Sequence, residues 1–332
     1  KGETGYMHEV TVSMFGPRGV GKTSLLTTMY ERFESDTSGA NLQITPDMES
    51  ASILQDRLGE LKSLFDREDT FFEAGDQKFG IQGTEEKRTF VFELGKLGEK
   101  PTLKLKFIDF PGKYISSSAT VEEKSSLKDI LEKSHALLVA IDTPSLMERH
   151  GKYNESINRP AEVTEFFKRV YQEGLKEPRL IVFAPIKCEK YIKNNQSEEL
   201  VKKIKTEYKR LFDLFKSDNL RNYIVTVITP VQTTGNVVFS HITSENEKTH
   251  FYFTKEHNEA RYDPKDSEQP LRYLLRFLLK LHLKQQETGW GIFSFLRSWL
   301  GIDKYLRDAI TRFTDRCKKG NGFEILQGYD KL

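Results

Sequence analysis

Apolar residues follow two alternating patterns along this chain. Three short runs are continuously apolar, which is typical of strands buried on both faces, over residues 136–141, 179–184 and 223–228. Around them apolar residues recur every three or four positions, which is typical of amphipathic helices, over residues 121–134, 161–175, 197–216 and 269–285. Strands that alternate with helices in this way predict a mostly parallel sheet covered on both faces.

The first part of the chain adds a strand over 9–15, a helix beginning at Ser24 and a second helix over 47–67. Two strand-like runs, 88–94 and 102–108, are separated only by a segment with glycines and a proline. That segment is too short for a crossover helix, so an antiparallel hairpin is predicted. A peripheral hairpin is expected from 237–242 and 250–253. The whole pattern predicts a three-layer α/β fold with one antiparallel edge strand.

Candidate chemistry begins between the first strand and the first helix. Residues 16–23, Gly-Pro-Arg-Gly-Val-Gly-Lys-Thr, fit the phosphate-binding pattern G-x-x-x-x-G-K-[ST]. The glycines let backbone N–H groups curl around an anion, Lys22 can reach terminal phosphates, and the Thr23 hydroxyl can ligate Mg²⁺. The sequence therefore predicts a P-loop fold that binds a nucleotide through Gly16, Arg18, Gly19, Val20, Gly21, Lys22, Thr23 and Ser24.

A second motif ends the predicted hairpin. The strand 102–108 runs into Asp109-Phe110-Pro111-Gly112, which places a carboxylate at the sheet edge where the phosphate-binding loop also lies. Asp109 is the predicted second metal ligand, and the backbone N–H of Gly112 is expected to approach a γ-phosphate.

The order of these elements resembles the TRAFAC class of GTPases, and more narrowly the bacterial double-GTPase family, over about residues 8–285. The likeness is carried by the loop 16–23, by the motif 109–112, by Thr229-Pro230-Val231-Gln232-Thr233 and by the helix start at 269–275. It implies a switch that binds GTP or GDP with Mg²⁺ and hydrolyses GTP.

The resemblance also implies further site residues. A switch threonine that closes over Mg²⁺ should precede the hairpin, where Thr84 is the best placed; Thr45, Thr70 and Thr89 are poorer candidates, and an ordinary loop threonine is an equal alternative. Guanine recognition, usually by [NT]-K-x-D, falls on Lys187 and Glu189 after Ile186, and a following motif on Val231. Ile186 cannot supply the usual polar side chain and Pro230 has no N–H, so guanine specificity is less certain than phosphate binding.

Hydrolysis depends on other positions. Where Ras-like enzymes carry a glutamine, this chain has Lys113, which can stabilise charge but is a poor base. Arg18 can act as an arginine finger, although pointing to solvent is the favoured alternative. Slow turnover without a partner, such as a protein regulator or a second copy of the chain, is the resulting hypothesis.

Composition narrows the class of protein. The 332 residues have a net charge of +2, which gives no reason to expect nucleic-acid binding. Cys188 and Cys317 are the two cysteines, in no metal-ligand spacing, and the seven histidines show no metal spacing or paired nucleophile. With no apolar run of membrane-spanning length, these features predict a cytoplasmic protein.

The predicted domains are a GTPase-like unit over 1–287, with insertions near 37–82 and 235–268, and an amphipathic helical tail over 288–332. The chain from Leu271 onward carries 12 Lys and Arg against 6 Asp and Glu, so it is the basic part of the molecule. Its apolar stripe is expected to pack on the chain itself; docking of a partner, or a peripheral membrane contact through 290–313, is less favoured.

The sequence thus predicts an Mg²⁺-dependent GTPase acting as a molecular switch in a bacterial signalling or conflict system. Two alternatives stay open. One is a catalytically feeble nucleotide-binding scaffold that recruits a protein through its tail, and the other is an ATPase on the same fold.

Overall fold

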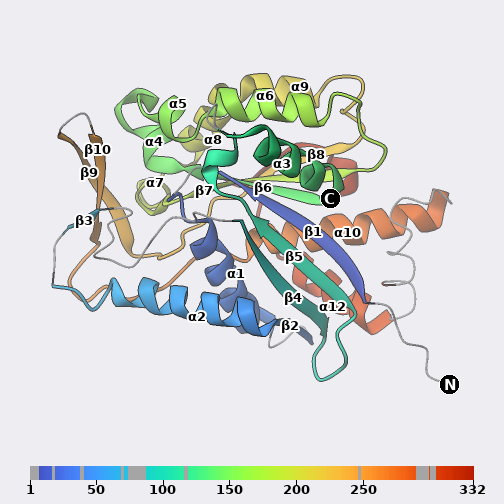
Figure 1. Ribbon diagram of the computed structural model, residues 1–332. Coiled ribbons are helices and arrows are strands. Elements are labelled where there is room, and N and C mark those ends of the chain that lie inside the picture. The colour runs from blue at the N-terminus through green and yellow to red at the C-terminus, as the bar shows by residue number, and fades with distance from the viewer. Residues whose placement is uncertain are drawn as a thin grey trace.

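A computed structural model describes residues 7–16, 19–37, 41–68, 71–73, 87–115, 119–245, 248–288, 299 and 304–332. Its centre is an eight-stranded sheet in the order β11-β8-β7-β6-β1-β5-β4-β2 (Figure 1). The strands are β1 (His8–Phe15), β2 (Leu42–Pro46), β4 (Arg88–Lys96), β5 (Leu103–Asp109), β6 (Ala136–Asp142), β7 (Arg179–Ile186), β8 (Ile224–Ile228) and β11 (Glu324–Gln327).

The central strands β5, β1, β6, β7 and β8 are parallel, whereas β4 pairs antiparallel with β5. The mostly parallel fold and the β4–β5 hairpin are thus confirmed. The antiparallel edge that β4 forms on β5 continues through β2, and β11 adds a further antiparallel strand beyond β8. Both added strands are short, so their sequences carry little of the period-2 pattern that marks a strand.

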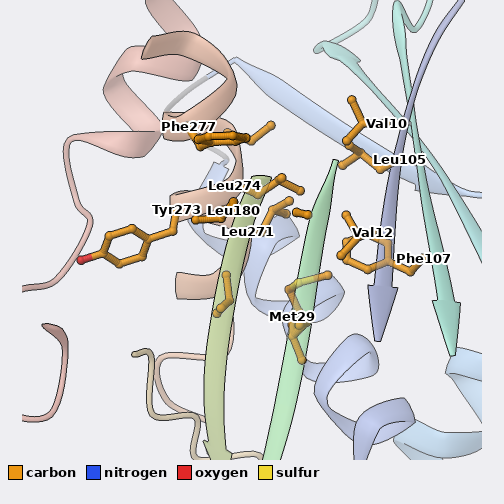
Figure 2. Close-up of a cluster of buried hydrophobic side chains, with 14 of the residues drawn as sticks. Val10, Val12, Met29, Leu105, Phe107, Leu180, Leu271, Tyr273, Leu274 and Phe277 are labelled. Carbon is orange, nitrogen blue, oxygen red and sulfur yellow. The ribbon is translucent and has the colours of Figure 1, made fainter. Parts of the chain in front are cut away.

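Helices cover both faces of the sheet (Figure 1). One face packs on α1 (Lys22–Thr37), α10 (Gln269–Thr288) and α12 (Lys304–Thr314), and the other on α3 (Val121–Lys133), α6 (Pro160–Val170), α8 (Ser197–Glu207) and α9 (Lys209–Phe215). Alternation along β7 divides the two cores: Leu180 and Val182 belong to the first, and Ile181 and Phe183 to the second. Figure 2 shows the first core, where Leu271, Leu274 and Phe277 of α10 lie against the sheet.

The described part of the tail belongs to the body of the protein. Leu306, Ala309, Ile310 and Phe313 of α12 are buried in the first core. Arg272 of α10 joins α12 to α1, because it donates to the carbonyl oxygen of Phe313 on α12 and to Asp36 Oδ2 on α1 at 2.8 Å. The tail is not purely helical, because β11 and a 3₁₀ turn, η4 (Tyr329–Lys331), follow α12. Residues 304–332 therefore pack against the rest of the chain.

A second, smaller sheet stands apart from the first. It pairs β3 (Phe72–Glu73), β10 (Lys248–Lys255) and β9 (Val237–Glu245), and it packs on the C-terminal end of α2 (Met48–Ser63). Asp47 caps the start of α2 by accepting a hydrogen bond from the N–H of Ser50 at 2.8 Å. These elements come from the two predicted insertions, and they form a third apolar cluster.

Short helices complete the chain: α4 (Thr143–Met147), α5 (Asn154–Ile157), α7 (Glu189–Lys193), η2 (Gly112–Ile115) and η3 (Glu148–Gly151). Among the described helices, none combines the length and the apolar character that crossing a membrane requires.

Candidate functional site

The loop 16–23 joins β1 to α1 at the carboxyl end of the sheet, as predicted. Its glycines are required by geometry. Gly19 and Gly21 have φ values of +73° and +111°, which disfavour any side chain, and a Cβ on Gly16 would lie 2.7 Å from the carbonyl oxygen of Ala140. Pro17 and Arg18 lie outside the described residues, so the role expected of Arg18 stays a prediction.

Three predicted residues meet at the start of α1. Lys22 Nζ donates to the carbonyl oxygen of Gly16 at 3.3 Å and lies 3.5 Å from Asp109 Oδ1. Thr23 Oγ1 donates to Asp109 Oδ2 at 3.3 Å. The Asp109 side chain is fully buried and that of Lys22 is 3% exposed. A cation, a hydroxyl and a carboxylate are therefore held together beside backbone N–H groups at a helix N-terminus, which suits a phosphate chain.

These oxygen donors suit Mg²⁺. This ion prefers hard oxygen ligands, and in phosphate-binding proteins it commonly uses one or two protein oxygens together with water and phosphate. Thr23 Oγ1 and Asp109 are such donors, and they lie within hydrogen-bonding distance of each other. Thr84, the third predicted ligand, lies outside the described residues, as does Thr70. Thr45 and Thr89 are strand residues, in β2 and β4. Over the described ranges, no three His, Cys, Asp or Glu side chains gather into a metal-binding group.

Lys187 connects the segment proposed to recognise the base, residues 186–189, to the phosphate-binding loop 16–23. Its Nζ donates to the carbonyl oxygen of Gly19 at 3.1 Å and to Asp142 Oδ2 at 2.7 Å. The backbone of Lys187 has φ +59°, a left-handed conformation that costs about 1–2 kcal/mol for a residue with a Cβ. Lys187 adopts this conformation while its side chain contacts the loop 16–23, and backbone strain of this kind is common at functional sites.

Asp142 is the partner of Lys187, and the sequence analysis did not predict it. It ends β6, and its Oδ1 accepts from the N–H and hydroxyl of Ser145. Burial alone would raise its pKa, but the charge and hydrogen bond of Lys187, together with the bonds from Ser145, hold the pKa below the usual value. The available signal was the one that identified Asp109, a carboxylate directly after an apolar strand.

Glu189 is held in place by the loop that follows β8. Its Oε1 accepts from Thr234 N at 3.1 Å, from Thr234 Oγ1 at 3.0 Å and from Gly235 N at 3.4 Å. The residue is 2% exposed, and burial raises the pKa of its carboxyl although these hydrogen bonds lower it. The carboxylate also accepts a hydrogen bond from the backbone N–H of Glu189 itself.

A cavity extends from the phosphate loop past Lys187 and Glu189. One side is formed by the loop, the base-recognition segment and the loop after β8, through Gly19, Val20, Gly21, Ser24, Lys187, Glu189, Thr233 and Thr234. The other side is formed by α2 and the small sheet, through Leu61, Leu64, Phe72, Glu73, Val237 and Phe253. Its volume is about 80 Å³, several times the ~10–15 Å³ that one water molecule requires on the same scale.

Two predicted residues are placed differently from expectation. Val231 is fully buried and its N–H donates to the carbonyl oxygen of Pro185 at 2.9 Å, so this N–H is already paired within the protein. Thr233 lines the cavity instead. Lys113 lies on η2 beside Gly112, with its ammonium 3.2 Å from Glu123 Oε1 and its side chain 58% exposed. It therefore faces α3 at the rim of the site.

Comparison with known proteins gives a distant likeness. No protein family and no curated protein matches the sequence. Among solved structures, the *S. cerevisiae* Ski7 GTPase-like domain bound to GDP and inorganic phosphate is similar at 14% identity and a TM-score of 0.38, covering 69% of this chain and 44% of that one. The same domain bound to GTP is similar at 13% identity and a TM-score of 0.38, covering 69% and 43%. A nucleolar GTP-binding protein 1 from *Plasmodium falciparum* is similar at 14% identity and a TM-score of 0.32, covering 69% and 79%.

Proposed function

We propose that this chain binds a nucleoside triphosphate with Mg²⁺, with GTP as the favoured nucleotide, and hydrolyses it slowly as a molecular switch. The observation that supports this proposal is the meeting of Lys22, Thr23 and Asp109 at the glycine-rich turn before α1. Each of these residue types has a defined task at a phosphate chain, and the fold brings Asp109 to the loop from another strand.

In this proposal the residues divide the work. Lys22 and the N–H groups of the loop would bind the β- and γ-phosphates, while Thr23 Oγ1 and Asp109 would hold the metal ion. Mg²⁺, when bound, neutralises charge on the phosphate oxygens. A water oxygen attacks the γ-phosphorus, the bond to the β-phosphate oxygen breaks, and the water proton ends on the released phosphate. Gly112 positions its N–H near the γ-phosphate.

Lys113 is proposed to approach the γ-phosphate by leaving Glu123. Their exposed ion pair contributes only about 0–1 kcal/mol, so the rearrangement is inexpensive. Because a lysine cannot orient water as a glutamine does, slow basal turnover follows. The two separated cysteines support placing the protein in the cytoplasm. The family resemblance supports a role in a bacterial signalling or conflict system, with a protein effector or a second copy of the chain as partner.

A second candidate is a binder that does not hydrolyse its nucleotide, and the position of Lys113 against α3 favours it. An ATPase is the third, because Ile186 replaces a polar side chain and Glu189 Oε1 is already hydrogen-bonded by the protein.

Calorimetric titration with GTP, GDP and ATP in Mg²⁺, followed by measurement of phosphate release, separates these candidates. We expect binding by the wild type and by Lys209→Ala, a change at an exposed lysine 71% accessible to solvent on α9, and loss of binding in Lys22→Ala. Failure of all three nucleotides to bind the wild type would overturn the proposal. Tighter binding of ATP would favour the ATPase, and binding without phosphate release would favour the non-hydrolysing binder.

A further inference from the structure

We propose that the small sheet and the end of α2 form a cover for the base of the bound nucleotide, with Phe72 and Phe253 against its flat face and Glu189 and Thr233 at its edge. The inference rests on the proposed nucleotide binding and names the part of the site that holds the base. It assigns a ligand-binding role to elements that come from the two insertions.

The position of the cavity is the first support. Gly21 and Ser24 of the phosphate loop line the same cavity as Phe72 and Phe253. A ligand whose phosphates lie on the loop therefore carries its remaining atoms toward the small sheet. Glu189 lines this cavity as well, so the base-recognition segment and the cover face a common space.

The cover has the chemistry that a flat aromatic ring requires. Phe72 and Phe253 are 7% and 6% exposed, and their rings stack with centroids 6.3 Å apart. Lys187 Nζ lies 5.7 Å from the centre of the Phe253 ring, so a cation and an aromatic ring meet where the base is expected. Bases stack on aromatic side chains whatever their identity, since each has a π-face.

The edge of the cavity offers hydrogen-bonding groups. All three hydrogen bonds that Thr234 and Gly235 donate to Glu189 end on Oε1, so neither residue occupies Oε2. Thr233 is 5% exposed and lines the same cavity, where its hydroxyl can donate a hydrogen bond. An acceptor beside a donor suits a base edge that presents a donor beside an acceptor.

The test compares GTP with inorganic tripolyphosphate, which carries phosphates but no base, in calorimetric titrations of the full chain with Mg²⁺. Phe253→Leu keeps an apolar side chain but removes the ring. We expect it to weaken GTP binding about tenfold and to leave tripolyphosphate binding unchanged within about twofold. Phe251→Leu is the matched control, because Phe251 lies on the same strand and in the same apolar cluster but does not line the cavity. It should bind GTP as the wild type does.

The outcomes separate this inference from the proposed function. If the wild type binds neither GTP nor tripolyphosphate, both fail. If it binds both with equal affinity, or if Phe253→Leu binds GTP as tightly as Phe251→Leu, the base cover is wrong while phosphate binding stands. Thermal melting checks that each variant is folded. Should Phe253→Leu not fold, Phe72→Leu on β3 provides the same comparison, with the same expected loss and the same contrary result.

Discussion

Replacing Glu189 with glutamine tests whether this carboxylate serves the nucleotide or only its own loop. Glutamine has nearly the same shape, and its single carbonyl oxygen can accept the hydrogen bonds that Thr234 and Gly235 now donate to Oε1. The other oxygen becomes an NH₂ group. The change therefore keeps the structural contacts and turns the group proposed to meet the base from an acceptor into a donor.

The effect on stability should be small and should depend on pH. Burial raises the pKa of the Glu189 carboxyl in the folded protein, so ionisation of this group destabilises the fold. That penalty is absent below the unfolded pKa of about 4 and grows as the pH rises toward the folded pKa. Glutamine carries no such penalty. We expect the free energy of unfolding of Glu189→Gln to change by no more than about 1 kcal/mol at neutral pH and to improve relative to wild type as the pH rises above about 4.

The effect on GTP binding should be large. A hydrogen bond to a charged acceptor contributes about 1.5–3 kcal/mol, which corresponds to a loss of roughly 10–150-fold in affinity when it is removed. Calorimetry with GTP measures this loss, and urea unfolding measures stability. Glu148→Gln is the control, because Glu148 also accepts hydrogen bonds, from Lys190 and Tyr191, but does not line the cavity.

Two results would refute this reasoning. A Glu189→Gln variant that binds GTP as tightly as Glu148→Gln would show that Oε2 does not meet the base. A loss of about 3 kcal/mol or more in the free energy of unfolding would show that the loop after β8 needs the charge of Glu189. The raised pKa of this carboxyl indicates the opposite, that the fold disfavours the charge.

Three further substitutions examine other parts of the molecule. Asp109→Asn should weaken GTP binding at least about tenfold in Mg²⁺ and little in EDTA, by calorimetry, because it removes a proposed metal ligand; equal losses in both would contradict that role. Arg272→Met should lower the free energy of unfolding in urea by about 3–5 kcal/mol, since the buried Glu268 and the partly buried Asp36 lose their cationic partner, whereas Arg210→Met, at an exposed ion pair, should cost no more than about 1 kcal/mol. Lys187→Met should make the free energy of unfolding depend less on pH in acid. Burial raises the pKa of Asp142, but Lys187 holds this pKa below its usual value. The wild type therefore loses stability as the pH falls below about 4, and the variant loses less. Identical slopes in urea series at several pH values would exclude this pairing as the cause.

The phosphate half of the site could be predicted from sequence because its chemistry is local. Gly16, Gly19 and Gly21 are needed for the turn itself, and Lys22 and Thr23 follow within the same segment. Asp109 comes from another strand, yet an apolar strand that ends in a carboxylate at the carboxyl edge of a parallel sheet can be recognised without knowing its neighbours. The order of the central strands and main helices was predictable for the same reason, since each element is long enough to show its own period.

The other parts of the fold and of the candidate site could not be predicted from the sequence, because they depend on contacts between segments that are distant along the chain. Val231 occupies the position that spacing suggested, but its N–H pairs with Pro185 of the neighbouring strand, and only the three-dimensional arrangement shows that Thr233 lines the cavity. The short strand β11 follows the same rule: it is defined by its pairing with β8, with an irregular register between Ile325 and Gln327, and not by a pattern of its own.

The proposed base cover gathers side chains from both predicted insertions, and this would explain why departures from the GTPase pattern concentrate there. Phe72 lies in the first predicted insertion and Phe253 in the second, and both line a cavity that also reaches Gly19 and Gly21. If these rings contribute to base affinity as proposed, Glu189 need not supply the full hydrogen bonding that an aspartate gives in the resembled family. Ile186 can then be apolar, because its place is beneath the loop, where its Cγ2 lies 3.7 Å from a Cβ built on Gly21. Under the proposed function, the loop 16–23 constrains the phosphates closely, while the identity of the base depends on segments that can change without disturbing that loop.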